Sequence, residues 1–314
     1  METLAPLFEE FISECEYSRR TRLQTLRGYR HAFSMFQKQI SDLELASLTP
    51  KTLNEFFRIL QTRKRVVGGV EKSGIADSTA ATYWSKLNTF FDWLATRGHI
   101  ETNPLRLMRE VRPRPNYDDP KSLRKKEIEK IMMAIENHAK NQFQFKRDRA
   151  IFYTLLFTGI RKGELIGLKT ADVDLERNIL TVHGETSKSC RTRQITIHPG
   201  LRLRLQDYLD ERSRSKPSWA SPYLFVSLLD DNGLGDNGYK RWVERLVRLS
   251  GVKFHLHRFR HTFAMNLANK NVGDSKVQRI LGHRDIRMTQ RYLRSLTPED
   301  MRQDINRLNI DEFM

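Results

Sequence analysis

Cysteine is scarce in this sequence of 314 residues, which contains only Cys15 and Cys190. The two cysteines lie far apart, and their positions do not have the spacing of metal ligands. A framework of disulfide bonds and a cysteine-based zinc site are therefore both excluded. Such sparse cysteine fits a protein of the reducing cytosol.

Long hydrophobic runs are also missing. No apolar stretch approaches the ~18–20 residues that a transmembrane helix needs. The N-terminal stretch METLAPLFEEFISECE is acidic and amphipathic, and it lacks the charged start, apolar run and cleavage site of a signal peptide. We therefore expect a soluble, cytoplasmic protein that has no membrane partner.

Positive charge, by contrast, is in excess. The chain has 55 Lys and Arg residues against 38 Asp and Glu, which gives a net charge of +17 and a pI near 10.0. Residues 1–120 hold 18 basic and 15 acidic residues, for a net charge of +3, whereas residues 121–314 hold 37 and 23, for +14. A balance this basic indicates a polyanionic partner, most commonly nucleic acid, although ribosomal and membrane-surface proteins can share it.

Helical apolar spacing dominates the first hundred residues and predicts four helices. Thr49 followed by Pro50 predicts a helix start, with Thr as the N-cap and Pro in the first helical position. The stretch RKRVVGGVEKSG at 63–74 is interpreted as a basic loop that contains glycine. On the polar faces of the helices, Arg27 and Lys86 are candidate contacts to DNA phosphates, with plain surface residues as the alternative.

A proline-containing, polar stretch at 105–120 is predicted to link a helical N-terminal domain at 1–104 to a second domain at 121–314. Arg112 and Arg114 in this stretch are candidate DNA contacts. A basic hinge suits a clamp around a duplex, and a simple connector is the alternative.

The second domain contains one predicted β-hairpin. Residues 179–183 and 193–197 alternate polar and apolar side chains, as strands do, and helical patterns precede and follow them. The polar turn between the strands carries Lys188. Arg191 and Arg193 on the same hairpin are interpreted as phosphate contacts or hairpin surface.

The segment at 255–292 concentrates side chains that suit a phosphate diester. It holds three histidines within seven residues, two arginines among them, then LGH and a tyrosine. Guanidinium groups bind two phosphate oxygens at once and keep their charge, tyrosine can act as a nucleophile, and lysine or histidine can transfer a proton. The chain lacks the clustered carboxylates that two-metal nucleases need. Arg258 in this segment is a further candidate DNA contact.

The segments TGIRKGEL, HLHRFRHTFA and LGHRDIRMTQRY resemble the signature boxes of tyrosine recombinases, the phage-integrase and Xer-type family. His283 follows Arg260 by 23 residues, and Tyr292 follows His283 by nine, as in this family. The resemblance implies a set of six catalytic residues, which comprises Arg161, Lys188, His257, Arg260, His283 and the nucleophile Tyr292.

This resemblance implies a mainly α fold with a small antiparallel β-sheet. A four-helix core-binding domain and an α+β catalytic domain would form a C-shaped clamp around DNA. The implied activity is site-specific cleavage and rejoining of DNA strands through a 3′-phosphotyrosine, without metal, ATP or another cofactor. By this resemblance, Arg161, Arg260 and His283 stabilise the phosphate. His257 assists proton transfer at Tyr292, and Lys188 protonates the leaving oxygen.

The resemblance also implies a partner and an assembly. The partner is a double-stranded DNA recombination site, on which a homotetramer forms from free monomers or dimers, and the protein would associate with the nucleoid. The tail from 298 to 314 is predicted to form an amphipathic helix that docks on a neighbouring protomer. No arm-binding domain precedes the first predicted helix, which favours an Xer-like or mobile-element system.

Three alternatives stay open at this point. A type IB topoisomerase would nick and reseal one duplex without exchanging strands, although the separate helical domain and the small size favour a recombinase. A DNA-binding regulator would keep the fold and lose the chemistry. His257 and His261 are four residues apart, as zinc ligands on a helix can be, but arginines flank them and a third ligand is missing.

Overall fold

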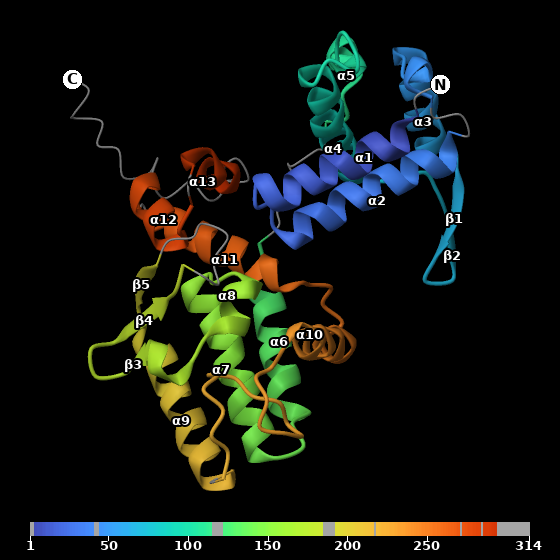
Figure 1. Ribbon diagram of the computed structural model, residues 1–314. Helices are drawn as coiled ribbons and strands as arrows, with labels where there is room; N and C mark the ends of the chain where they lie inside the picture. The colour runs from blue at the N-terminus through green and yellow to red at the C-terminus, as the bar shows by residue number, and fades with distance from the viewer. Residues whose placement is uncertain are drawn as a thin grey trace, which may run out of the picture. The chain divides into compact units, whose positions relative to one another are not determined.

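The computed structural model describes residues 3–40, 44–114, 122–184, 192–216, 218–270, 272–283 and 285–293. The chain divides into two compact units, Met1–Tyr117 and Asp118–Met314. Figure 1 shows the elements of both, and each unit is described by itself. No helix in these ranges has the length and hydrophobicity of a transmembrane segment.

Four longer helices form the N-terminal unit, as the apolar spacing predicts (Figure 1). Thr49 caps the third of them, because its hydroxyl oxygen accepts a hydrogen bond from the main-chain N–H of Thr52 at 3.3 Å, and Pro50 occupies the first helical position. The helices are α1 (Leu4–Ser13, extended by a π-helical turn at Glu14–Ser18), α2 (Leu23–Gln39), α3 (Pro50–Thr62) and α4 (Asp77–Thr96).

Aromatic rings fill the core between these helices. Phe8 of α1 stacks on Phe33 of α2 with ring centroids 3.9 Å apart, and its other contacts include the edge of Phe90 from α4 at 5.1 Å. All three rings are buried. Burial of such rings is worth roughly 25 cal/mol per Å² of apolar surface, so this cluster stabilises the packing of α1, α2 and α4 against one another.

The segment after α3 is a β-hairpin and not the loop that the sequence suggested. Strands β1 (Lys64–Val67) and β2 (Val70–Ser73) pair antiparallel, from Lys64 opposite Ser73 to Val67 opposite Val70. Gly68 and Gly69 both have positive φ, at 58° and 79°, which a tight two-residue turn of this kind requires. The Gly-Gly pair between two valine-containing runs is the signal that the loop interpretation overlooked.

Part of the predicted linker is folded. Residues Pro104–Leu107 form the short helix α5, and a 3₁₀ turn follows at Arg109–Val111. Leu105 and Met108 are buried in the N-terminal core, because their spacing places both on the same face of this segment. Residues 115–120 lie outside the described ranges, and the predicted domain boundaries stay a prediction.

The C-terminal unit contains eight helices of six or more residues among those described, and one small sheet (Figure 1). The hairpin predicted at 179–183 and 193–197 is present, and a two-residue strand that the sequence did not indicate joins it at the edge, in the antiparallel order β3-β4-β5. The elements are α6 (Lys125–Asn137), α7 (Gln142–Thr158), α8 (Lys162–Gly167), β3 (Val173–Asp174), β4 (Ile179–Val182), β5 (Arg193–Thr196), α9 (Pro199–Ser215), α10 (Asp236–Ser250), α11 (Leu256–Ala268), α12 (Asp274–Leu281) and α13 (Ile286–Leu293).

Helix α7 is the central element of this unit and packs against α9, α11 and α6. It ends at Gly159, whose left-handed φ of 57° only glycine adopts without strain. A Cβ atom at Gly159 would lie 2.5 Å from the ring of Phe263 in α11, so the close approach of these two segments also requires glycine. The predicted fold class, mainly α with a small antiparallel sheet, is confirmed.

Candidate active site

Two arginines from distant parts of the chain meet on one turn. Helix α12 ends at Leu281, and Gly282 continues the chain in the left-handed conformation, with φ at 65°. Arg260 donates a hydrogen bond to the carbonyl oxygen of Leu281 at 2.7 Å, and Arg161 donates one to the carbonyl oxygen of Gly282 at 3.1 Å. The LGH turn therefore brings together all three segments that resemble the signature boxes.

Arg260 is fixed by its burial and by two carbonyl groups. Only 1% of its surface is exposed, and besides Leu281 it donates to the carbonyl oxygen of Gly159 at 2.7 Å. The guanidinium group thus connects the end of α7 to the end of α12. A charged group is buried here with strong acceptors, which is the condition under which burial of charge is tolerated.

Arg161 is oriented by Glu164, one turn further along the chain. Its main-chain N–H and its Nη1 atom each donate to the Glu164 carboxylate at 2.9 Å. Glu164 is itself 1% exposed. Arg161 also precedes the first residue of α8, so its backbone is set by the helix start. The i, i+3 spacing of these residues is the sequence signal for this pair.

Arg193 of β5 completes an ionic network around Glu164. Its two terminal nitrogens donate to the two carboxylate oxygens at 3.0 and 2.8 Å, and its Nε atom donates to the carbonyl oxygen of Ile280 at 3.0 Å. A Cβ atom at Gly282 would lie 3.1 Å from the Arg193 side chain, so this turn fits closely over it. The sequence interprets Arg193 as a phosphate contact or as hairpin surface. Its contacts with Glu164 and Ile280 lie inside the unit and do not test a phosphate contact.

His283 lies at the centre of the positive charges. It is 6% exposed, and its Nδ1 atom shares a hydrogen bond of 2.8 Å with the hydroxyl group of Thr289 in α13. Burial, together with the positive charges of Arg260, Arg161 and Arg193, lowers the pKa of His283 to about 3. The imidazole is therefore neutral at pH 7 and can donate one hydrogen bond. Thr289 is a supporting residue that the sequence did not reveal.

His257 and His261 lie on α11, and their rings contact edge to face with centroids 4.8 Å apart. His257 is exposed, whereas His261 is partly buried. Within the described ranges, the structure contains no cluster of three or more His, Cys, Asp or Glu residues arranged for a metal ion.

Three of the predicted residues are described only in part or not at all. Tyr292 lies in α13, nine residues after His283, and its side chain is outside the described part of the structure. Lys188 and Arg191 lie outside the described residues. Their assignment stays a prediction.

Arg258 makes internal contacts at the start of the C-terminal unit. It donates to the carbonyl oxygens of Lys253 at 2.6 Å and Ser122 at 2.9 Å, and it forms an ion pair with Glu127 of α6 at 3.2 Å. Its predicted role as a DNA contact is not tested by these contacts. They show that the side chain ties α11 to the segment that precedes α6.

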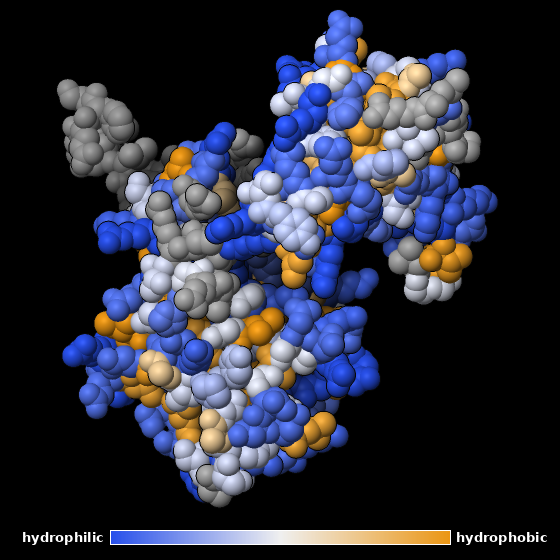
Figure 2. Space-filling view, viewed as in Figure 1, coloured by the Kyte–Doolittle hydropathy of each residue, from blue (hydrophilic) through white to orange (hydrophobic). Residues whose placement is uncertain are grey.

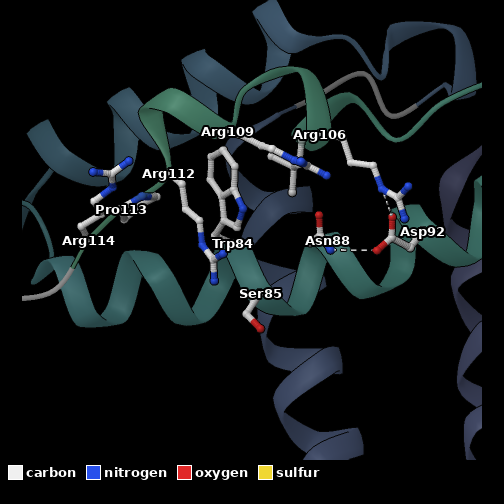
Figure 3. A pocket seen from close by; sticks show the side chains of 10 residues that line it. Trp84, Ser85, Asn88, Asp92, Arg106, Arg109, Arg112, Pro113 and Arg114 are labelled. Carbon is white, nitrogen blue, oxygen red and sulfur yellow. Dashed lines mark hydrogen bonds and ion pairs between the residues drawn. The ribbon is translucent and has the colours of Figure 1, made fainter. Parts of the chain in front are cut away.

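A basic groove of about 880 Å³ lies in the N-terminal unit, between α4 and the segment from α5 to residue 114 (Figure 3). Asp92 pairs with Arg106 across it at 2.9 Å. Arg112 and Arg114, which are both predicted DNA contacts, lie in this groove and are exposed. Its charged lining consists of Arg106, Arg109, Arg112, Arg114 and Asp92.

The other predicted contacts in this unit lie on α2 and α4. Arg27 is exposed on α2, and the ammonium group of Lys86 on α4 lies 4.4 Å from the ring centre of Tyr29. This cation–π contact holds the Lys86 side chain against α2.

Comparison with known proteins agrees with this geometry. The model of the phage integrase family matches residues 121–299, and that of the phage integrase SAM-like domain matches residues 3–111. Tyrosine recombinase XerC of Thermodesulfovibrio yellowstonii is 27% identical over 288 residues, which cover 90% of this chain and 89% of that protein. Tyrosine recombinase XerA of Pyrococcus furiosus is 32% identical over 195 residues, which cover 62% and 63%.

Solved structures share the fold. The Tn1549 transposon integrase in complex with transposon right end DNA has a TM-score of 0.74 at 20% identity, with 98% of this chain and 99% of that chain covered. A lambda integrase dimer bound to a COC′ core site has a TM-score of 0.68 at 20% identity, with 92% and 77% covered. Because the family model spans more than half of the sequence and includes every described element of the LGH site, the chain belongs to the phage integrase family of tyrosine recombinases.

Proposed function

We propose that this protein is a site-specific recombinase that cuts and rejoins double-stranded DNA through a covalent bond to Tyr292. The observation that carries the proposal is the convergence of Arg161, Arg260 and His283 on one turn. Helix α13, which contains Tyr292, begins three residues after His283. Two permanent cations and one neutral hydrogen-bond donor, followed along the chain by a tyrosine in α13, suit a phosphate under attack.

In the proposed reaction, the Tyr292 oxygen attacks the scissile phosphorus and displaces the 5′-oxygen of the next nucleotide. The products are a 3′-phosphotyrosine and a free 5′-hydroxyl. His257 accepts the tyrosine proton, and Lys188 gives a proton to the leaving oxygen, so that charges and protons balance. Attack of a 5′-hydroxyl on the phosphotyrosine reverses the step and rejoins the strand. The energy of the phosphodiester bond is kept throughout, so this reaction needs no ATP, and the two guanidinium groups would supply the positive charge that a metal ion supplies in other nucleases.

Arg161 and Arg260 would stabilise the charge that grows on the non-bridging oxygens of the phosphate. A positioned donor of this kind typically contributes ~3–4 kcal/mol to the lowering of the barrier. His283, which the surrounding cations keep neutral, would donate a further hydrogen bond. Because Glu164 and main-chain carbonyls already orient both guanidinium groups, little reorganisation is needed when the phosphate arrives.

The N-terminal unit would hold the duplex through its backbone. The arginines of the basic groove, together with Arg27 and Lys86, present charge to phosphates. Such contacts position a protein on DNA without reading its sequence. We propose that residues 1–104 and 121–314 act as two domains that clamp one duplex, and that the protein is located at the nucleoid.

Recombination joins two sites, and we propose that it requires a homotetramer in which the tail from 298 to 314 docks on a neighbouring protomer. The test is deletion of this tail in the otherwise complete chain. The truncated protein should still bind one site and should no longer recombine two. Normal recombination without the tail would contradict the docking.

The covalent intermediate is the direct test of the proposed chemistry. The substrate is a duplex from the DNA beside the gene, nicked next to the cleavage position so that the released fragment diffuses away. The wild-type protein should form a covalent adduct with this DNA, and Tyr292→Phe should bind the DNA and form none. Tight binding without an adduct for either protein would favour the regulator.

A second measurement separates the recombinase from a topoisomerase. Two labelled duplexes that carry the site should exchange strands in the presence of the wild-type protein. Relaxation of supercoiled DNA without any exchange would contradict the recombinase and support a nicking–resealing enzyme.

A further inference from the structure

The hairpin β1–β2 projects from the helices of the N-terminal unit (Figure 1). All four residues of β2 are exposed, and Val66 of β1 and Val70 of β2 are 73% and 58% exposed. An isolated two-stranded hairpin is marginally stable in water, and valine on both arms should favour a covered position. A hairpin of this kind is therefore a candidate contact surface.

The base of the hairpin is fixed to α3. Gly74 is buried with φ at 65°, and its N–H donates to the carbonyl oxygen of Arg63 at 2.8 Å. A Cβ atom at this position would lie 2.2 Å from the carbonyl oxygen of Gln61. The Gly74 carbonyl oxygen in turn accepts a hydrogen bond from Nε of Arg65 at 2.7 Å. The hairpin is thus held rigidly where it joins the helix.

Both faces of the hairpin are available for contact. Val66 lies opposite Glu71, and Val70 lies opposite Val67, so the two exposed valines belong to opposite faces. No atom lies within 4 Å of the Cβ positions built on Gly68 and Gly69, which form the tip. In Figure 2 the tip carries an apolar patch on a largely hydrophilic unit. A partner that takes in the tip would cover both valines at once.

The charge of the hairpin selects the class of partner. Lys64, Arg65 and Lys72 stand against Glu71 alone. The ion pair between Lys64 and Glu71, at 3.2 Å, joins two side chains that are 81% and 62% exposed, so it contributes little and Lys64 can turn to another anion. Short strands rich in Lys and Arg also discourage addition of a strand from another protein.

We propose that the hairpin enters a groove of the duplex, where Lys64 and Lys72 contact phosphates and the valines contact the apolar parts of sugars or thymine methyl groups. The major groove of DNA admits a two-stranded β-ribbon. This inference rests on the proposed function, because it gives the N-terminal unit a second contact with the DNA that the catalytic unit cuts. The alternative partner, a second copy of the chain, is separated from DNA by the experiment below.

The test places a photo-crosslinking amino acid at Val66 of the full-length protein and irradiates it with a duplex of mixed sequence. We expect a crosslink to DNA. The same amino acid at Leu229, which is 90% exposed in the C-terminal unit, is the control for random collision. A crosslink from Val66 to a second protein chain would overturn the inference. So would a yield of DNA crosslink from Val66 no higher than that from Leu229 when the protein is bound to the duplex.

Salt dependence gives a second, independent measure. Each phosphate contact contributes about 0.9 to the slope of log K against log salt, so Lys64→Gln with Lys72→Gln should lower the slope by about 1 to 2. The matched control is Lys130→Gln with Lys140→Gln, which removes the same charge from exposed positions on and just after α6. Equal slopes for both double variants would contradict the hairpin contact.

The two proposals fail in different ways. If the wild-type protein forms the Tyr292 adduct but Val66 does not crosslink to DNA, the hairpin inference is wrong and the proposed function stands. If Val66 crosslinks to DNA but no adduct forms, the hairpin contact stands and the proposed chemistry is wrong.

Discussion

The two units of the chain bury different kinds of side chain. Among the described residues, the N-terminal unit buries aromatic rings and a single polar side chain, Asn103. The C-terminal unit buries the other polar and charged side chains of this class, including Glu164, Arg260 and His283. Packing of aromatic rings holds helices together but does not determine the position of any charged group. A buried network of ion pairs and hydrogen bonds determines the position of each charged group closely. The second unit therefore contains the groups whose positions matter for chemistry.

This difference also concerns stability. Buried ionic groups contribute little net stability, because desolvation offsets their attraction, yet removal of one partner is strongly destabilising. Apolar packing responds more gradually to substitution. Substitutions of equal size in the two units should accordingly have different consequences.

The largest expected effect is on the cleavage rate, and it distinguishes two buried arginines, Arg260 and Arg212, which both donate hydrogen bonds to main-chain carbonyl groups. Arg260→Lys should slow cleavage about 10²- to 10³-fold, because a lysine cannot hold two carbonyl groups and a phosphate in the geometry of a guanidinium group. Arg212 is the matched control, since it is 8% exposed and donates to the carbonyl oxygens of Tyr223 and Ser221, both at 2.7 Å. Single-turnover cleavage of the nicked duplex is the measurement. Equal losses in Arg260→Lys and Arg212→Lys would mean that both act through folding alone.

A smaller effect is expected from the centre of the ionic network. Glu164→Gln keeps the shape of the side chain and leaves Arg161 and Arg193 buried without a carboxylate. The free energy of unfolding of the C-terminal unit should fall by about 3–5 kcal/mol. Hydrogen exchange measures the two units separately, and protection in the N-terminal unit should not change. An equal loss of unfolding free energy in both units would show that the ionic network does not stabilise the C-terminal unit separately.

The counterpart in the N-terminal unit should be milder. Phe90 packs against Phe8, Phe33 and Phe91, and Phe90→Leu replaces one apolar side chain by another. We expect a loss of about 1–3 kcal/mol, confined to the N-terminal unit. The cleavage rate at saturating DNA should not change. A loss in Phe90→Leu as large as that in Glu164→Gln would remove the distinction between ring packing and ionic packing.

Acid should weaken the two units in different pH ranges. His283 has a folded pKa of about 3 against an ordinary value of 6.5, so the unfolded state binds more protons between these values. The C-terminal unit should therefore lose stability as the pH falls below 6.5. Glu14 in the N-terminal unit accepts hydrogen bonds from Trp93, Arg97 and Arg19, which lower its pKa from 4.5 to about 2, so its contribution is lost only below pH 4.5.

Urea unfolding between pH 6.5 and pH 4.5 checks this expectation. The free energy of unfolding of the C-terminal unit should fall with pH less steeply in His283→Gln than in the wild type. The difference in slope should be at most about 1.4 kcal/mol per pH unit, which corresponds to one proton. The N-terminal unit should show no decline in this range from Glu14. An unchanged slope in His283→Gln would mean that other groups cause the acid sensitivity.

The sequence predicted the parts of the fold that depend on local pattern. The N-cap of Thr49, followed by Pro50 in the first helical position, depends on residue types with strong backbone preferences, and it is confirmed. The charges at 63–74 suggest a loop, whereas the Gly-Gly pair between two valine-containing runs is the local signal for the β1–β2 hairpin. The prolines and polar residues of 105–120 predict a linker, and the spacing of Leu105 and Met108, which are both buried in the N-terminal core, is a helical signal within that stretch.

The site could be predicted as a set of residues but not as a network. Motif spacing names Arg161, Arg260 and His283, yet it does not say that main-chain carbonyl groups hold the two arginines. Nor does it distinguish an arginine that faces DNA from one that faces a buried carboxylate, as Arg193 does. Such contacts join residues between 21 and 121 positions apart, and they exist only after the chain has folded.

The LGH turn has a consequence for how the distance between the two phosphate-binding arginines is set. Arg260 and Arg161 bind the carbonyl oxygens of Leu281 and Gly282, which belong to consecutive peptide groups. Consecutive Cα atoms are separated by a covalent length of about 3.8 Å that neither temperature nor side-chain repacking alters appreciably. The two cations are thus attached to consecutive peptide groups, whose spacing along the chain is set by covalent geometry.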